Sequence, residues 1–469
     1  MSQILHEDRN GCALHGAVKA ISAVEGLVPV LHASAGCGLG ARFPENTLAG
    51  SLAGTAGWQE TSGTNLLEKH VVFGGTSRLR EQIKNTVKVL KGDLYVVATG
   101  CVPEVVGDDV PAMVKEAREQ QFPVIGISTP GFKGNGWHGA ATAIRQVLEQ
   151  LPTLQDLPVA KDAGLVNLLG IAPGLDPFWE GDLLELEAAL APLGLRAQRL
   201  FGIGQKTSDW KNAKNASLSV VLSPWGLEAA RFLEQRDGIP FLDFGFIPVS
   251  SRDVGLLLAK VSEALGLAPE AATHLALAED RKLRYYLRKA APTWLSGEFQ
   301  RRTAIVAGSA AAVGLSRFLS GTLGQIVTTV VITDNPPEDS RASLVQHIRD
   351  ASEGIEIDVS FTESSVDVLR ALSSARPELV LGSSLERLWS IESGAALVEV
   401  SAPLREELVL DQSLAGTRGA LSVTTSISRA LLFAGHAQAS GIRPENAKTA
   451  EPRRLALSIP AHKGCESCG

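Results

Sequence analysis

Short apolar runs alternate along this chain with segments whose apolar residues recur at helical spacing. In the first third, residues 27–31, 94–98 and 123–127 form apolar runs rich in β-branched residues, as buried strands do. A long connection rich in glycine and threonine follows the first run, and residues 79–90 and 144–151 have helical periodicity. Strands that alternate with helices form parallel sheets covered by helices, so we expect an α/β fold.

The same alternation occurs twice more, after the polar residues 152–162, which have the composition of a linker. Residues 268–300 are rich in helical pattern and connect the second set to the third. The later strands are expected at residues 164–171, 196–201, 217–222, 239–243, 303–307, 326–333, 378–382 and 396–400. At about 150 residues per domain, 469 residues correspond to about three domains. The predicted domains are residues 1–155, 156–300 and 301–445, followed by a tail at 446–469.

Charge and hydropathy argue against two classes of partner. The net charge of −7 leaves no basic surface of the kind that binds nucleic acid. No apolar run reaches the roughly 18 residues of a membrane-spanning helix, and the first residues lack a signal pattern. Five cysteines, of which three lie near one end, do not resemble a disulfide framework and suit a reducing compartment. We therefore expect a cytoplasmic protein that contacts neither nucleic acid nor membrane.

Three of the cysteines, Cys12, Cys37 and Cys101, each lie in a glycine-flanked segment within the first hundred or so residues. Two of them follow predicted strands, and in parallel sheets ligand sites lie beyond the carboxyl ends of the strands. Neighbouring glycines would let a group larger than a single atom approach the backbone, and thiolates are the usual ligands of iron–sulfur clusters. The alternative is three buried, unreactive thiols, because the wide spacing matches no compact zinc or ferredoxin pattern.

Four segments around these cysteines have distinctive sequences. They are residues 11–12 (GC), 28–37 (VPVLHASAGC), 72–75 (VFGG) and 101–109 (CVPEVVGDD). In this order they resemble motifs of the nitrogenase component 1 family: Gly-Cys, a strand followed by His-Gly-x-x-Gly-Cys, Val-Phe-Gly-Gly, and Cys-x-x-Glu-x-x-Gly-Asp-Asp. A weaker resemblance continues to the last third of the chain. The resemblance implies three Rossmann-like domains, with mainly parallel sheets covered by helices, and a cluster shared with a sister chain.

The resemblance also implies which half of the enzyme this chain forms. The α-type chain of the family anchors its active-site cofactor through a mid-chain cysteine, and no cysteine lies between Cys101 and Cys465. The chain is therefore similar to the β type, whose three cysteines correspond to Cys12, Cys37 and Cys101. They would hold an iron–sulfur cluster, a P-cluster of the 8Fe–7S type, shared with an α-type subunit in an α2β2 heterotetramer. No catalytic residue is expected here.

Electrons would come from a transiently bound, ATP-hydrolysing iron protein homodimer and pass through this cluster to the cofactor in the α-type partner. Phe73, in the Val-Phe-Gly-Gly motif, would lie on the surface that the iron protein docks against; a core phenylalanine is the alternative. His32 would be a hydrogen-bond donor near a sulfide of the cluster, or a buried histidine with other partners. Glu104, Asp108 and Asp109 are interpreted as capping and structural residues.

Two departures from the family pattern bear on the substrate. Residues 129–132 read TPGF where the family has Thr-Pro-Ser-Phe, so Gly131 offers no oxygen to an oxidised cluster, and Ala33 replaces the glycine after the motif histidine. These differences favour a nitrogenase-like relative. Among such relatives methylthio-alkane reductase is preferred, because the resemblance implies that its β-type chain keeps three cluster cysteines. A nitrogenase β subunit and a cofactor-assembly scaffold remain alternatives, tetrapyrrole-reducing relatives are less favoured, and a metal-free α/β binding protein is the alternative of another class.

Two further motifs predict little. The loop 202–207 (GIGQKT) lacks the spacing of a phosphate-binding loop, and residues 307–310 lack a dinucleotide fingerprint. We therefore expect no nucleotide or active-site cofactor on this chain alone. Cys465 and Cys468 form a Cys-x-x-Cys beside His462, which would bind zinc only with a fourth ligand from elsewhere; reduced thiols on a tail are the favoured interpretation.

Overall fold

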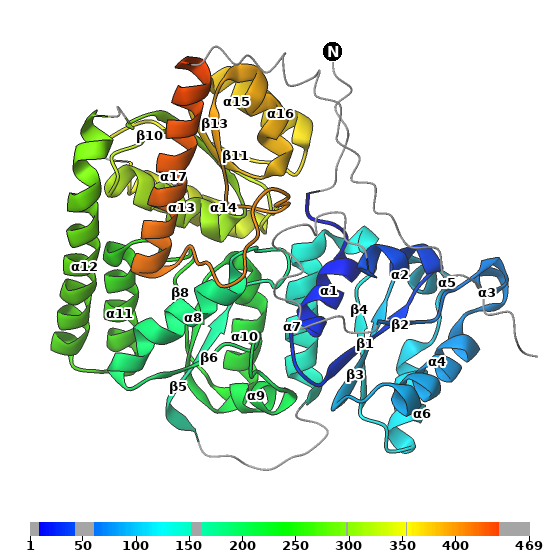
Figure 1. The fold of residues 1–469 in the computed structure, drawn as a ribbon. Helices are drawn as coiled ribbons and strands as arrows, with labels where there is room; N and C mark the ends of the chain where they lie inside the picture. Colours follow the sequence, from blue (N-terminus) through cyan, green and yellow to red (C-terminus); the bar gives the residue numbers. More distant parts are fainter. Residues whose placement is uncertain (1–8, 43–60, 152–160, 297–298, 353, 440–469) are drawn as a thin grey trace, which may run out of the picture.

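The computed structural model describes residues 9–42, 61–151, 161–296, 299–352 and 354–439 of the chain. Within these residues, three sheets, each with all its strands parallel, are flanked by helices (Figure 1). The predicted α/β fold class is confirmed. The predicted linker at 152–162 falls largely outside the described residues, as does the tail with Cys465 and Cys468.

The first unit, drawn in blue to cyan, carries the three predicted thiols (Figure 1). Its strands, in the order β2-β1-β3-β4, are β1 (Leu27–His32), β2 (Ser62–Gly63), β3 (Leu94–Thr99) and β4 (Val124–Ser128). Its helices are α1 (Ala13–Ser22), α2 (Ala35–Arg42), α3 (Glu68–Phe73), α4 (Thr76–Val89), α5 (Cys101–Val106), α6 (Val110–Glu119), the 3-10 helix η1 (Gly131–Lys133) and α7 (Gly136–Gln150). Two of these helices, α2 and α3, lie in the segment that the sequence predicted as a connection.

The second unit has the strand order β6-β5-β7-β8. Its strands are β5 (Asp162–Leu169), β6 (Arg196–Gln198), β7 (Ala216–Val221) and β8 (Phe241–Asp243). Its helices are α8 (Trp179–Leu190), α9 (Thr207–Asn212), α10 (Leu227–Asp237), α11 (Ser251–Leu265) and the long α12 (Pro269–Ser296).

The third unit has the strand order β11-β10-β9-β12-β13. Its strands are β9 (Arg302–Ala307), β10 (Ile326–Ile332), β11 (Asp358–Phe361), β12 (Leu379–Gly382) and β13 (Ala396–Glu399). Its helices are α13 (Ser309–Gly321), α14 (Glu338–Arg349), α15 (Ser365–Ala375), the 3-10 helix η6 (Ser384–Glu386), α16 (Arg387–Ser393) and α17 (Gly416–Ala439).

Burial explains why the sheet of the first unit forms as it does. All residues of β1 and β3 are buried, and their register runs from Leu27 opposite Leu94 to His32 opposite Thr99. Pro29 is tolerated in β1 because β2 pairs only with Val30 and Leu31, so the missing N–H breaks no bond on that side. One apolar core covers the α1 and α7 face and continues into the other units, and a smaller one lies under α4 and α6.

Candidate functional site

The strand order of the first sheet places two of the predicted thiols at one crevice. The chain passes from β1 outward to β2, then crosses to β3 on the other side of β1. The direction of the strand order thus reverses between β1 and β3, and the loops that leave their carboxyl ends diverge. In parallel sheets, ligands bind in the crevice that opens at such a reversal. Cys37 follows β1, in α2, and Cys101 is the first residue of α5, directly beyond β3.

The packing of α1 on α7 brings Cys12 to the same edge of the sheet. A Cβ at Gly16 or Gly139 would overlap backbone atoms of the opposite helix, so these glycines allow the two helices to touch. Residues 11–13 and 134–136 also pair through backbone hydrogen bonds of 3.1 Å. Cys12, the residue before α1, is therefore fixed beside the loop that follows β4.

Gly131 lies next to two of the sulfurs. A Cβ built at this residue would be 3.5 Å from the Cys12 Sγ and 3.3 Å from the Cys101 Sγ. The two thiols thus come near one point, although Cys12 precedes α1 and Cys101 begins α5. A glycine at this point leaves room beside the sulfurs that a larger side chain would fill.

Cys37 lies next to the first turn of α1. Its carbonyl oxygen is 3.2 Å from the Nε2 of His15, which follows Cys12 by about one helical turn. The hydroxyl of Ser34 is 3.5 Å from the Cys37 Sγ. Cys12 and Cys37 are half-buried against the main core, whereas Cys101 is exposed.

The chemistry of this donor set fits a metal–sulfur cluster. Thiolates are the ligands that hold iron–sulfur clusters, and a hydroxyl near a ligating sulfur is one of the features that set a cluster's potential. In the part of the chain that the structure describes, no group of three or more His, Cys, Asp or Glu side chains is placed to hold a single metal ion. The space beside Gly131, next to the Cys12 and Cys101 sulfurs, suits a group larger than one ion.

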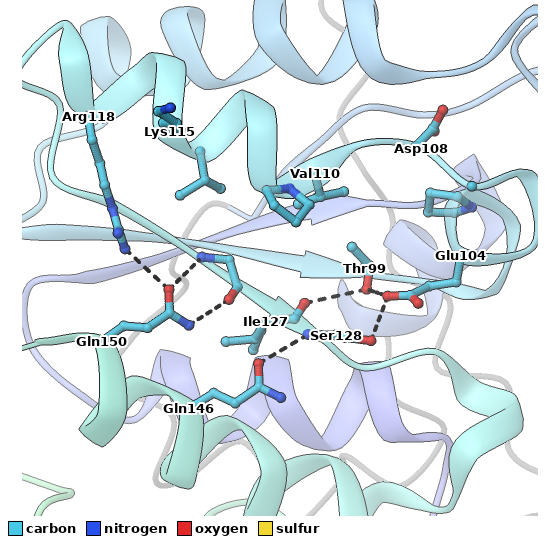
Figure 2. Close-up of a pocket in the computed structure, with 15 residues that line it drawn as sticks. Thr99, Glu104, Asp108, Val110, Lys115, Arg118, Ile127, Ser128, Gln146 and Gln150 are labelled. Carbon is cyan, nitrogen blue, oxygen red and sulfur yellow. Dashed lines mark hydrogen bonds between the residues drawn. The ribbon is translucent and has the colours of Figure 1, made fainter.

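A cleft of about 570 Å³ runs beside α5 and along the edge strand β4 (Figure 2). At one end Glu104 accepts hydrogen bonds from the hydroxyls of Thr99 and Ser128, the latter at 2.6 Å. Further along, the Gln150 amide bonds both backbone groups of Gly126, donating at 2.7 Å and accepting at 3.4 Å. Such contacts cap an exposed sheet edge. Glu104 thereby anchors α5 to the ends of β3 and β4, a structural role.

Asp108 joins three of the sequence motifs. Its Oδ1 accepts hydrogen bonds from the Gly75 backbone N–H at 2.7 Å and from the Thr76 hydroxyl at 3.3 Å. Its Oδ2 is 3.0 Å from the Nε2 of His32, whose Nδ1 is 3.2 Å from the Thr64 hydroxyl. The carboxylate therefore ties the end of β1 and the loop after α3 to the loop that follows α5.

His32 is a buried partner of this carboxylate. Burial lowers the pKa of His32 more than the nearby Asp108 charge raises it, so the ring is neutral near pH 7. Both ring nitrogens already face oxygen partners, which leaves neither aimed at a sulfide in this arrangement. Gly75 must be a glycine here, because a Cβ would lie 2.6 Å from the Asp108 Oδ2 and 3.1 Å from the His32 Cε1.

Helix α3 lies at the far edge of the first unit (Figure 1) and carries most of an exposed apolar patch. Phe73, the last residue of α3, is 86% exposed, so it is not a core phenylalanine. We call its surroundings the α3 patch; its exposed members are Leu67, Val71, Val72, Phe73 and Val105. Clusters of exposed apolar side chains of this kind mark surfaces that bind other proteins.

The family model for nitrogenase component 1 type oxidoreductases matches residues 12–432. The chain belongs to this family. Within it, this nitrogenase-like chain is of the β type, as predicted from its cysteines. The nitrogenase molybdenum-iron protein beta chain of Methanothermobacter marburgensis is 26% identical over 454 residues, which cover 90% of this chain and 93% of that one.

Other relatives of this nitrogenase-like chain carry different names. A chain of the light-independent protochlorophyllide reductase of Methylobacterium radiotolerans is 28% identical, over 66% of this chain and 56% of its own length. The cofactor biosynthesis protein NifE of Bradyrhizobium diazoefficiens is 28% identical, over 52% of this chain and 44% of its own. A solved structure titled nitrogenase Cp1 at pH 6.5 has the same fold, with a TM-score of 0.76, 19% identity and coverage of 92% and 94%.

The structure brings the Cys12 and Cys101 thiols near one point, with the Cys37 backbone against His15 of α1; the His32 ring bonds Thr64 and Asp108, and Phe73 is exposed on α3. Sequence reasoning missed the bonds of Asp108, because two acidic residues in a row both suggested a helix cap and only Asp109 caps α6, accepting from Ala112 N at 3.0 Å.

None of the described helices has both the length and the apolar character of a membrane span.

Proposed function

We propose that this chain is the β-type subunit of a nitrogenase-like reductase and relays electrons through a cluster that it shares with an α-type partner. The observation that carries the proposal is the placement of the Cys12 and Cys101 sulfurs next to Gly131, at the carboxyl end of a parallel sheet. The exposure of Cys101 supports a site completed by another chain. The match to a molybdenum-iron protein beta chain over nearly its whole length supports the same subunit type.

Cys12, Cys37 and Cys101 would hold the cluster, a P-cluster of the 8Fe–7S type, in an α2β2 heterotetramer. When bound, such a cluster accepts and donates electrons at a potential set by its ligands and surroundings. The half-buried positions of Cys12 and Cys37 limit water around their sulfurs, and the Ser34 hydroxyl is placed to donate to Cys37. Because both His32 nitrogens have oxygen partners, we assign His32 to positioning rather than to a sulfide.

The α3 patch, with Phe73 at its most exposed point, would receive the ATP-dependent iron protein. The patch is apolar, and α3, which carries most of it, ends at the Gly74–Gly75 turn that Asp108 holds in place. A docking surface of this kind needs exposed apolar side chains on a rigid support, and both are present. The chain itself would contribute no catalytic side chain; reduction of the substrate would occur on the cofactor of the α-type partner.

Our preferred substrate class is the methylthio-alkanes. The departures at Ala33 and Gly131, which remove a glycine and a hydroxyl of the family pattern, argue against an ordinary dinitrogen-reducing enzyme. Three cluster cysteines are what we expect of a methylthio-alkane reductase β-type chain, and this chain has them. Reductive cleavage of a methylthio-alkane takes two electrons and two protons, breaks one carbon–sulfur bond, and yields an alkane and methanethiol. A nitrogenase β subunit is the second candidate, favoured by the full-length match to the molybdenum-iron protein beta chain.

The test is a substrate comparison with the complete system. This chain, its α-type partner and the iron protein would be co-expressed, purified without oxygen and supplied with ATP and dithionite. Release of methanethiol and ethane from ethyl methyl sulfide, without ammonia from dinitrogen, is the expected result. Ammonia as the main product would establish the nitrogenase alternative, and neither product from an iron-loaded complex would favour an assembly scaffold. A complex with Cys101→Ala serves as the control.

A further inference from the structure

The segment that carries Cys12 is bound to the third unit as well as to the first. Arg9, three residues before the thiol, reaches into the third unit, where its Nη2 is 2.6 Å from the Glu386 Oε1 and its Nη1 donates to the Ser383 hydroxyl at 2.8 Å. Both side chains of the ion pair are only 1% exposed. The second oxygen of Glu386 accepts from the backbone N–H and the hydroxyl of Ser383, so the carboxylate is itself held in place.

A second carboxylate of the third unit holds both of the paired segments around Cys12, residues 10–13 and 134–136, which we call the Cys12 loop. The Oε1 of Glu363 accepts hydrogen bonds from the Nδ2 of Asn10 at 2.8 Å and from the Nδ2 of Asn135 at 2.7 Å. Its Oε2 accepts from Asn335 at 3.0 Å. The Asn10 amide also donates to the Thr333 carbonyl at 2.7 Å, so the residues on either side of the Cys12 loop are fastened to one place.

Within the described residues, the hydrogen bonds of the Cys37 and Cys101 segments stay in the first unit. Cys101 begins the helix directly beyond β3, and Cys37 lies in α2, the helix that follows β1, so elements of the first sheet lead into both. Cys12 precedes α1. Besides its pairing with residues 134–136 of the first unit, it is held by contacts of Arg9 and Asn10 that cross to the third unit. A small change in the placement of the third unit would therefore move Cys12 against the other two sulfurs.

We propose that Arg9 and Asn10, together with Glu386 and Glu363, form a positioning clamp through which the third unit sets the place of Cys12. We call these four residues the Cys12 clamp. They are positioning residues that act through Cys12 and touch no substrate. The part of this inference that concerns the cluster rests on the proposed function, whereas the part that concerns the thiol does not.

The first test uses the complete chain without iron. Iodoacetamide would be added to the folded protein, and the modification rate of each cysteine followed by peptide mass spectrometry. Loss of a charge-assisted hydrogen bond shifts a local opening equilibrium by about tenfold or more, so Arg9→Met is expected to raise the Cys12 rate by about tenfold. The rates of Cys37 and Cys101 are expected to stay within about twofold.

Arg317→Met is the matched control. Arg317 pairs with the buried Asp253 at 2.8 Å, which also joins the third unit to the second, but neither residue contacts the Cys12 loop. This variant is expected to leave the Cys12 rate unchanged. An unchanged Cys12 rate in Arg9→Met, or an equal rise at all three cysteines, would overturn the inference. If circular dichroism shows that Arg9→Met does not fold, Glu363→Ala decides by the same readout, because Glu363 is only half-buried.

The second test uses the complex with its α-type partner. In Arg9→Met the midpoint potential of the cluster is expected to shift, and iron to be lost faster to a chelator than in the Arg317→Met control. Unchanged potential and iron retention, despite a faster Cys12 rate, would overturn the link to the cluster. If the wild-type complex and both variant complexes all lack iron, the proposed function is refuted. The alkylation rates would still decide whether the clamp exists.

Discussion

Replacement of Asp108 by alanine is the perturbation whose consequences the structure defines most closely. Alanine removes three contacts together, those to the Gly75 N–H, the Thr76 hydroxyl and the His32 ring. Asp108→Asn is the milder substitution, because the asparagine amide oxygen can still accept the hydrogen bond from the Gly75 N–H. Its NH₂ group can then donate to the Nε2 of His32, which is neutral, while Nδ1–H donates to Thr64.

The expected magnitude follows from the charged acceptor. A hydrogen bond to a charged group contributes about 1.5–3 kcal/mol, and about 1.4 kcal/mol corresponds to a factor of ten in an equilibrium. Local opening of the loop after α3 should therefore become about 10- to 150-fold more frequent in Asp108→Ala. In Asp108→Asn the effect should be smaller, about tenfold or less, because one strong acceptor is kept.

The assay is hydrogen–deuterium exchange, followed by mass spectrometry on peptides that span residues 73–76. Asp109→Ala is the matched control: it removes the cap of α6, a bond from Ala112 N at 3.0 Å, and should speed exchange in that helix only. Equal exchange at 73–76 in wild type and Asp108→Ala would refute the view that this carboxylate holds the loop. Faster exchange there in Asp109→Ala would refute its specificity.

Three further predictions concern pH, the glycine beside the sulfurs, and docking. Burial raises the pKa of Asp176 to about 6 and that of Asp182 well above the usual 3.8, so the folded chain holds protons that the unfolded chain releases. Thermal stability should therefore fall as pH rises from about 4 through 6. Melting curves taken between pH 4 and 8 should show a smaller fall for Asp182→Asn than for the wild type. Gly131→Ser, compared with Gly131→Ala, should lower the potential of the oxidised cluster by offering an oxygen, as a redox titration followed by paramagnetic resonance would record; equal potentials in both variants would exclude oxygen ligation. Phe73→Ala should raise the KM for the iron protein by about tenfold and leave the melting temperature unchanged, because the ring is exposed. Leu388, an exposed residue of the third unit, is the control: Leu388→Ala should change neither the KM nor the melting temperature.

The fold and the three thiols could be predicted because their signals are local. A strand such as β3 is a short, fully buried run of apolar and β-branched residues, and the cysteine directly after it has to lie at the carboxyl end of a parallel sheet. The strand β11 was missed because it lies at a sheet edge with partly exposed residues, including Asp358. Helices α2 and α3 were missed because glycine-rich sequence around them weakens helical periodicity.

The partners of the charged residues could not be predicted, because they are far apart in sequence. Arg9 and Glu386 are brought together only when the first and third units pack, and neither residue has a local pattern that names the other. The same holds for His32 and Asp108, which bring the end of β1 against the loop that follows α5. Resemblance to a family found the motifs that contain His32 and Asp108, but only the fold shows which atoms within them touch.

The central claim is that this chain holds a metal–sulfur cluster at the three thiols, and iron analysis tests it most directly. The chain would be purified without oxygen together with its α-type partner, and iron, acid-labile sulfide and paramagnetic resonance measured for wild type, Cys101→Ala and Cys468→Ala. We expect more iron than one 4Fe–4S cluster would supply per αβ pair, lost in Cys101→Ala and retained in Cys468→Ala. A colourless wild-type complex without iron would contradict the claim, as would iron content that Cys101→Ala leaves unchanged.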